Sequence, residues 1–150
     1  MTDLKLIAFD AEDLAVFSAN LQDAVVRAAD MTYLKAEKRF VAVANRFDWE
    51  ASVASGGKAL TRRRCGLRFE RVLGAKVSGF QPGNSDAVLS LLSIAFDESA
   101  APGGTLTLTF SGNAAIRLEV ECVEGEMKDL GAAWQTQSRP EHDSGPKPGT

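Results

Sequence analysis

Hydrophobic positions near the N-terminus first form a short run and then repeat with helical spacing. Residues 4–9 are mostly apolar, and we interpret them as a first strand. Asp10 follows and can accept a hydrogen bond from the free N–H groups of a helix start. Apolar residues then recur at steps of three and four, as one helical face requires. They are Leu14, Phe17, Leu21 and Val25. The pattern predicts a helix over about 11–23 that buries Phe17 and Leu21 against a sheet.

After this helix the period shortens towards two. Two apolar runs flank the polar residues 35–38, and the second run ends near Phe47. Such a pattern is typical of a β-hairpin. A longer helix through Ala29 is the alternative, and we favour strands from Asp30 onward.

The middle of the chain contains two loops and one irregular strand. Residues 48–60 are predicted to form a loop, because Ser55, Gly56 and Gly57 are small and flexible and little in the stretch could pack. Leu67 and Phe69 then alternate with charged residues. The alternation slips at residues 72–74, where a glycine follows two apolar residues, and this predicts a bulge or bend. Residues 81–85 are predicted to form a turn.

The second half of the chain shows the clearest strand pattern. Residues 88–96 are expected to form a buried strand, and residues 102–104 mark a turn. Apolar and polar residues then alternate over 105–110 and again over 116–122, on either side of the turn 111–114. This predicts a hairpin with one face in the core and one in water.

The C-terminal part is harder to interpret. Residues 124–134 have apolar positions spaced for a short helix that could cap one open end, although a strand is not excluded. These positions are Met127, Leu130 and Trp134. Residues 135–150 contain three prolines, two glycines and no large apolar residue, which predicts a disordered tail. We therefore expect a single globular domain over residues 1–134.

Together these elements predict an α+β fold. The pattern indicates about seven mostly antiparallel strands in a curved sheet or half-open barrel, with one N-terminal helix packed on it. A chain of 150 residues fits one domain of ordinary size. Which strand forms the edge cannot be read from the pattern.

Composition is that of an ordinary globular protein, with 45% hydrophobic and 25% charged residues. No apolar stretch approaches the roughly 20 residues that span a bilayer, and no export signal is visible. We therefore expect a cytoplasmic protein without a membrane contact. Two cysteines, Cys65 and Cys122, favour buried thiols over a disulfide or redox pair.

Charge is unevenly distributed along the chain. The net charge is −3, yet residues 58–76 contain seven basic side chains and one acidic side chain. We call residues 58–76 the basic segment. Acidic side chains cluster later, over residues 119–129, which we call the acidic run. We favour a solvated face for the acidic run. The alternatives are acid–base or cation-binding carboxylates, or a strand that faces the basic strand of a second copy or partner.

No catalytic or metal site is recognisable. The single histidine, His142, lies in the predicted tail, where no packing would hold a general base in place. Cys65 and Cys122 have no histidine partner at zinc-site spacing. The stretch 55–58 resembles part of a phosphate-binding loop but lacks the following helix. We assign no catalytic residue, metal or cofactor, and the sequence leans away from an enzyme without deciding the question.

Arginines of the basic segment are the main binding candidates. Three in a row at 62–64 offer planar donor groups that suit phosphate and carboxylate. The pI of about 5.2 and the lack of interleaved aromatics argue against nucleic acid. A solvated or internally paired surface is favoured, and a protein partner or self-association is the next alternative. A second patch, residues 45–50, mixes aromatic rings and charges. We favour its aromatic rings as anchors of the core edge, with its charged residues in local ion pairs, and a binding patch is the alternative. The candidate binding residues are Arg46, Trp49, Arg62, Arg63, Arg64 and Arg68.

Several stretches of the chain resemble one known family. They are residues 4–8, 10–14, 36–40, 45–50, 62–64, 86–92 and 116–122. The family is a small bacterial one classed only as a domain of unknown function. The similarity extends over nearly the whole chain, up to about Arg139. It implies a bacterial single-domain protein and brings no activity, ligand or catalytic residue.

The sequence thus leaves three functions open. We expect a non-catalytic binding or interaction module that uses the basic segment and the patch around Arg46 and Trp49. Its partner would be an unidentified protein or a second copy, with strand-edge pairing as one route. The alternatives are a ligand-binding protein or enzyme with a pocket between helix and sheet, and weak nucleic-acid or polyanion binding through residues 62–64.

Overall fold

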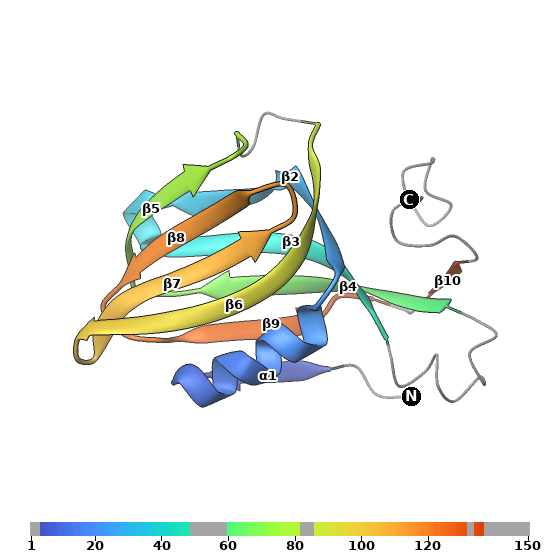
Figure 1. Cartoon of the computed structure of the whole chain (residues 1–150). Coiled ribbons are helices and arrows are strands. Elements are labelled where there is room, and N and C mark those ends of the chain that lie inside the picture. The colour runs from blue at the N-terminus through green and yellow to red at the C-terminus, as the bar shows by residue number, and fades with distance from the viewer. Residues whose placement is uncertain (1–3, 49–59, 82–85, 132–133, 137–150) are drawn as a thin grey trace.

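A computed structural model describes residues 4–48, 60–81, 86–131 and 134–136 (Figure 1). In these residues the chain forms one α-helix, one short 3-10 helix and ten strands of a single sheet. The elements are β1 (Lys5–Ala8), α1 (Ala11–Leu21), β2 (Ala24–Leu34), η1 (Lys35–Glu37), β3 (Arg39–Phe47), β4 (Leu60–Phe69), β5 (Val72–Ser78), β6 (Val88–Ala100), β7 (Gly103–Phe110), β8 (Ala114–Val120), β9 (Gly125–Asp129) and β10 (Trp134–Thr136).

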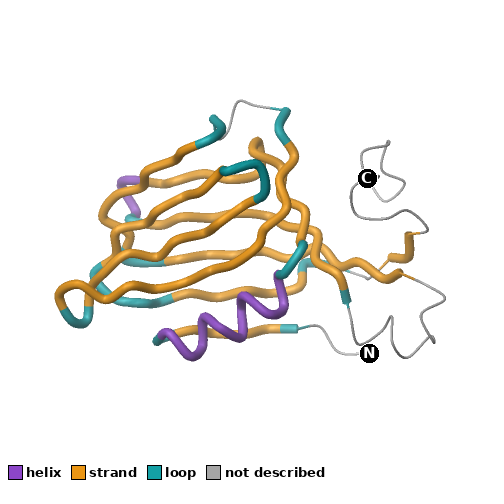
Figure 2. The backbone as a smooth tube through the Cα atoms, viewed as in Figure 1, coloured by secondary structure: helices purple, strands orange, loops and turns teal. Residues whose placement is uncertain are grey.

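Nine strands follow one another in the order β1-β9-β4-β3-β2-β6-β7-β8-β5, and β10 pairs separately with β4. Every pairing in the described sheet is antiparallel. The sheet curls so that β5, β8, β7 and β6 form one wall and β2, β3, β4 and β9 form the other (Figures 1 and 2). It is not closed, because β1 and β5 end the order. The predicted α+β class and curved open sheet are confirmed, with nine strands in the main order rather than seven.

Helix α1 begins as the sequence predicts. The Asp10 side chain accepts a hydrogen bond from the backbone N–H of Asp13 at 2.8 Å. Leu14, Phe17 and Leu21 form the buried face, each at most 1% exposed. The helix ends at Leu21, two residues before the predicted end, because the chain turns at Asp23 with a φ of 65° and enters β2.

The helix also closes an opening between the two walls. Ser18 Oγ accepts a hydrogen bond from the backbone N–H of Ile94 in β6 at 3.1 Å. The Phe17 ring lies 6.3 Å from the Phe69 ring of β4, between centroids. The amide that β6 would otherwise leave unpaired is therefore satisfied by the helix, and a continuous core forms behind it.

Strand β2 begins six residues before the predicted start at Asp30. Its first residues pair with β3 on one side and β6 on the other. Ala24, Val25 and Val26 are consecutive and all buried, so no alternation marks the strand in the sequence. A register shift between Val26 and Met31 disturbs the pattern further. The choice of strand over a longer helix is confirmed.

The other hairpins and the bulge are also confirmed. The runs around residues 35–38 form β2 and β3, and the alternation on either side of 111–114 forms β7 and β8. The register of β5 against β8 shifts between Val72 and Gly74, where the pattern slips. Strand β6 continues to Ala100 instead of ending at residue 96.

The helical interpretation of residues 124–134 is wrong. Gly125, Met127 and Asp129 alternate inward on β9, whereas Lys128 is exposed. The period is two, and the three apolar positions have helical spacing by coincidence. Gln135 and Thr136, at the start of the predicted tail, pair with β4. The rest of that tail, most of the predicted loop 48–60 and most of the turn 81–85 lie outside the described residues.

No helix within the described part of the chain has the length and apolar character that a membrane crossing needs.

Replacing Phe17 by alanine should remove the centre of the helix–sheet contact. Because the side chain is fully buried, we expect the free energy of unfolding to fall by about 3–5 kcal/mol in urea denaturation. Val16, its neighbour, is 47% exposed, so Val16→Ala is the matched control and should cost less than about 1 kcal/mol. Equal losses for the two variants would show that α1 is not anchored through this face.

Candidate functional site

The structure divides the predicted binding residues into buried and exposed groups. Arg46, Arg62 and Arg63 are 6%, 0% and 2% exposed. Arg64 and Arg68 are exposed, because they lie on the outward side of β4. Trp49 lies outside the described residues.

Two of the buried arginines face each other inside the fold. Arg46 of β3 and Arg63 of β4 are directly opposed in register. Like charges at such positions repel unless anions lie between them. Asp129, at the end of β9, and Asp48, just after β3, supply two carboxylates, and all four side chains are buried. We call these four residues the buried charge cluster, and their formal charges sum to zero.

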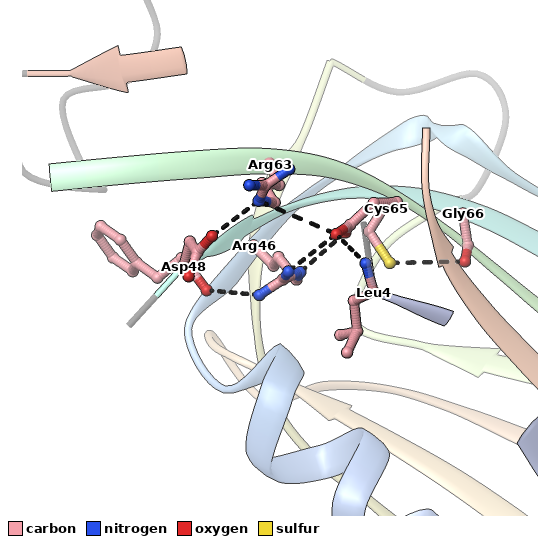
Figure 3. Close-up of polar contacts among 8 residues, drawn as sticks. Leu4, Arg46, Asp48, Arg63, Cys65 and Gly66 are labelled. Carbon is pink, nitrogen blue, oxygen red and sulfur yellow. Dashed lines mark hydrogen bonds and ion pairs between the residues drawn. The ribbon is translucent and has the colours of Figure 1, made fainter. Parts of the chain in front are cut away.

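Hydrogen bonds within the buried charge cluster are short (Figure 3). Arg46 donates from Nε to Asp129 Oδ1 and from Nη2 to Asp129 Oδ2, both at 3.0 Å. This two-point contact is the strongest geometry for a guanidinium and a carboxylate. Arg63 donates from Nε to Asp48 Oδ2 at 2.7 Å, and the same nitrogen lies 4.0 Å from Asp129 Oδ2. Each arginine therefore has a carboxylate at hydrogen-bonding distance.

Asp129 also joins the start of the chain to this cluster. Its Oδ2 accepts a hydrogen bond from the backbone N–H of Leu4 at 2.8 Å, and its own N–H donates to the Leu4 carbonyl at 2.9 Å. Burial lowers the pKa of Arg46, but the hydrogen bonds and charge of Asp129 outweigh it, so this pKa lies above its ordinary value. The cluster links β3, β4, β9 and the segment before β1.

Arg62 is held by an aromatic ring. Its guanidinium carbon lies 4.2 Å from the centroid of the Phe47 ring, and Nη1 donates to the Asn45 carbonyl at 3.0 Å. Cations placed over an aromatic face in this way are stabilised by the ring. Only Arg64 of the predicted three-arginine stretch is therefore presented to solvent.

Charged residues on the outer face of β3, β4, β9 and β1 form a continuous row. Glu70 contacts Arg39 and Arg68 at 2.9 Å each, and Glu126 contacts Arg68 at 2.9 Å and Lys5 at 3.5 Å. We call these five residues the outer ion-pair row. Arg68, a predicted binding residue, thus has two carboxylate partners in its own chain.

The basic segment and the acidic run pair with each other. In addition to the contacts above, Arg71 lies 3.7 Å from Glu121 and 3.5 Å from Glu124. Opposite charges that are separated in sequence therefore meet within one molecule. Among the described residues, no group of histidine, cysteine or acidic side chains could hold a metal ion.

Two cations on the outer face have no ion pair among the described residues. Arg64 and Lys128 are both exposed and lie on adjacent strands, with Lys128 opposite Gly66. Leu130 lies beside them, 49% exposed, and its N–H donates to the Arg64 carbonyl at 2.8 Å. The Leu130 side chain covers Gly66, where a Cβ would approach Leu130 Cδ1 to 3.3 Å. We call Arg64, Lys128 and Leu130 the basic–apolar patch.

Sequence reasoning identified Arg64 but missed the other two patch residues. Lys128 and Leu130 fell in the stretch whose apolar spacing looked helical. The alternation of inward Gly125, Met127 and Asp129 was the signal that could have placed them on the outer face of a strand.

A shallow groove lies where the sequence allowed a pocket between helix and sheet. It is open to solvent and lined by small, aliphatic or uncharged polar residues, with no arginine or glutamate. The lining residues are Ala15, Ser18, Ala19, Gln22, Leu92 and Ile94. The groove therefore offers no charged group for acid–base chemistry.

A family model matches residues 4–142 of the 150 in the chain. The chain belongs to the DUF2948 family. This is a family of proteins of unknown function, so the resemblance stated above is confirmed over nearly the whole length. No curated protein and no solved structure matched the chain. The match continues past residue 134, where the sequence pattern placed the end of the globular domain.

The two thiols of this DUF2948 protein differ in environment and are not joined. Cys65 is fully buried beside the buried charge cluster, whereas Cys122 is partly exposed. Burial, together with the negative charge of Asp129, raises the pKa of Cys65 to about 11. The expectation of a buried thiol holds for Cys65, which is an unreactive core residue at neutral pH.

Asp129→Asn should destabilise the DUF2948 protein strongly. The substitution keeps the shape of the side chain but removes the charge that two buried arginines face. We expect a loss of about 3 kcal/mol in the free energy of unfolding, as for other broken buried ion pairs. Glu126→Gln on the same strand is the matched control and should cost about 1 kcal/mol or less, because that pair is partly solvated. A cost for Asp129→Asn as small as the control would contradict the role assigned to the cluster.

Stability should also fall at alkaline pH because of Cys65. The pKa of this thiol is raised in the native state, so its neutral form is favoured by folding. The resulting stabilisation is complete below the ordinary pKa of 9.0 and is lost as the pH rises towards about 11. We expect a loss on the order of 2–3 kcal/mol, measured as the difference in unfolding free energy between the wild type and Cys65→Ala across this range. Parallel pH profiles for the two proteins would refute the assignment.

Proposed function

We propose that this DUF2948 protein is a non-catalytic binding module that contacts a protein partner through the basic–apolar patch. The observation behind the proposal is the state of Arg64 and Lys128. Both are exposed on adjacent strands and have no ion pair among the described residues, whereas the arginines around them are buried or paired. These two cations on adjacent strands are free to form ion pairs with another molecule.

The chemistry of the patch favours a protein with an acidic surface. Leu130 contributes exposed apolar area between the two cations, and a mixture of apolar and arginine side chains is typical of protein interfaces. Arginine and lysine on a rim steer oppositely charged partners towards the surface. Nucleic acid is less favoured, because Arg62 and Arg63 are buried and the three arginines cannot grip a phosphate backbone together.

We place this module in the cytoplasm as part of the same proposal. Its two thiols are not joined, which agrees with a reducing compartment.

Charge reversal of the patch tests the proposal. The protein is immobilised, and an extract of the cells that naturally produce it is passed over the wild type and over Arg64→Glu with Lys128→Glu. We expect one protein to be retained by the wild type and reduced about tenfold by the double variant, as loss of two exposed ion pairs would cause. Retention should weaken with added salt.

A second double variant serves as the matched control. Arg27→Glu with Lys35→Glu makes the same change in net charge at two exposed positions of β2 and η1, away from the patch. The proposal requires this control to retain the partner. Equal loss in both variants would indicate non-specific charge attraction, and unchanged retention in the patch variant would show that the patch is not the binding surface.

A further inference from the structure

Strand β5 is an open edge of the sheet. It pairs with β8 on one side, and no described strand pairs with its other side. Within the described part of the chain, only the first residue of β5 forms backbone hydrogen bonds away from β8. The Val72 N–H donates to the Lys38 carbonyl at 2.9 Å, and the Val72 carbonyl accepts from Tyr33 Oη at 2.9 Å. From Gly74 to Ser78, no backbone hydrogen bond to a described residue occurs on the side away from β8. These backbone groups are therefore available to another strand.

Two other free edges of the sheet are more protected. Part of the free edge of β6 beyond Leu91 contacts α1, whose Ser18 hydroxyl accepts from the Ile94 amide. Strand β1, the other end strand, has only four residues and contacts α1. Strand β5 has seven residues and lies at the rim of its wall, away from the helix (Figure 1). It is thus the longest end strand and the least protected.

Charges beside this edge select the kind of strand it can accept. Lys76 of β5 and Arg117 of β8 are directly opposed in register, both exposed, and without an ion pair among the described residues. Like charges in this position are unfavourable, so an acidic side chain nearby would relieve them. Ala75 and Val77 alternate with Lys76, face the core and are only partly buried. An apolar side chain next to them would complete their burial.

We propose that the β5 edge binds an extended acidic segment of a partner protein as an additional strand. The segment would alternate acidic and apolar residues, with an acidic side chain beside Lys76 and an apolar one beside Val77. Backbone hydrogen bonds provide the affinity in this mode of recognition, and the alternate side chains provide the specificity. A second copy of this chain fits less well, because β5 itself has no acidic side chain to place beside Lys76.

This inference does not depend on the basic–apolar patch, which lies on the outer face of β4 and β9. The two proposals can therefore fail separately.

The probe for this edge is a blocked peptide of alternating glutamate and valine, as long as β5. Amide hydrogen exchange of the full chain is followed by NMR as the peptide is added. We expect protection to increase at amides within residues 74–78 and not in β1. A peptide with lysine in place of glutamate should give no protection.

Two single charge reversals make the result specific. Lys76→Glu should weaken binding of the glutamate–valine peptide about fivefold, the effect expected for replacing an attractive cross-strand pair with a repulsive one. Arg27→Glu makes the same change in net charge at an exposed position of β2, outside both proposed binding surfaces, and should leave the affinity unchanged. Three results would overturn the inference: no protection of residues 74–78 at saturating peptide, equal weakening by both variants, or protection that rises with protein concentration when no peptide is present.

Discussion

The carboxylate of Asp129 is the group on which the arrangement of the wall formed by β2, β3, β4 and β9 depends. Two inward-facing arginines oppose each other on β3 and β4, a placement that would drive the strands apart in a low-dielectric interior without anions. Asp129 approaches from β9 with two hydrogen bonds to Arg46, and Asp48 takes Arg63. The repulsion is thereby converted into an attraction between three strands. The same carboxylate binds the backbone of Leu4, so the first strand depends on it as well.

The cluster also explains the uneven charge of the sequence. A run of arginines followed much later by a run of acidic residues suggests an exposed basic surface when it is read along the chain. In space, β4 and β9 are neighbours, and their charges meet on both faces. Asp129 pairs on the inward face, whereas Glu126 pairs on the outward face. Exposed cations without an ion pair among the described residues include Arg64 and Lys128 on one wall and Lys76 and Arg117 on the other.

Much of the fold was predictable because local patterns agree with it. The helix, its Asp10 cap, the two main hairpins and the bulge after Val72 each follow from a period or a turn within a few residues. The failures have a common cause, since they occur where a long-range neighbour decides the structure. The start of β2 is buried by strands on both sides, and β9 is a strand because it lies between β1 and β4. The prediction of binding residues was the least successful, because nothing in residues 62–64 shows that two of the three arginines have partners elsewhere in the molecule.

The pairing of β1 with β9 has a consequence for how the chain is made in the cell. Residues 5–8 find their partner only at residues 125–128, nearly the whole length of the chain later. During synthesis β1 has no strand partner until β9 has left the ribosome. The residue after the last paired position of β9 is Asp129, which neutralises the opposed arginines. The sheet is therefore completed and the arginines are neutralised together. A nascent chain that has not yet reached residue 129 therefore lacks both at once, so the pairing of β1 and the neutralisation of Arg46 and Arg63 become possible at the same point.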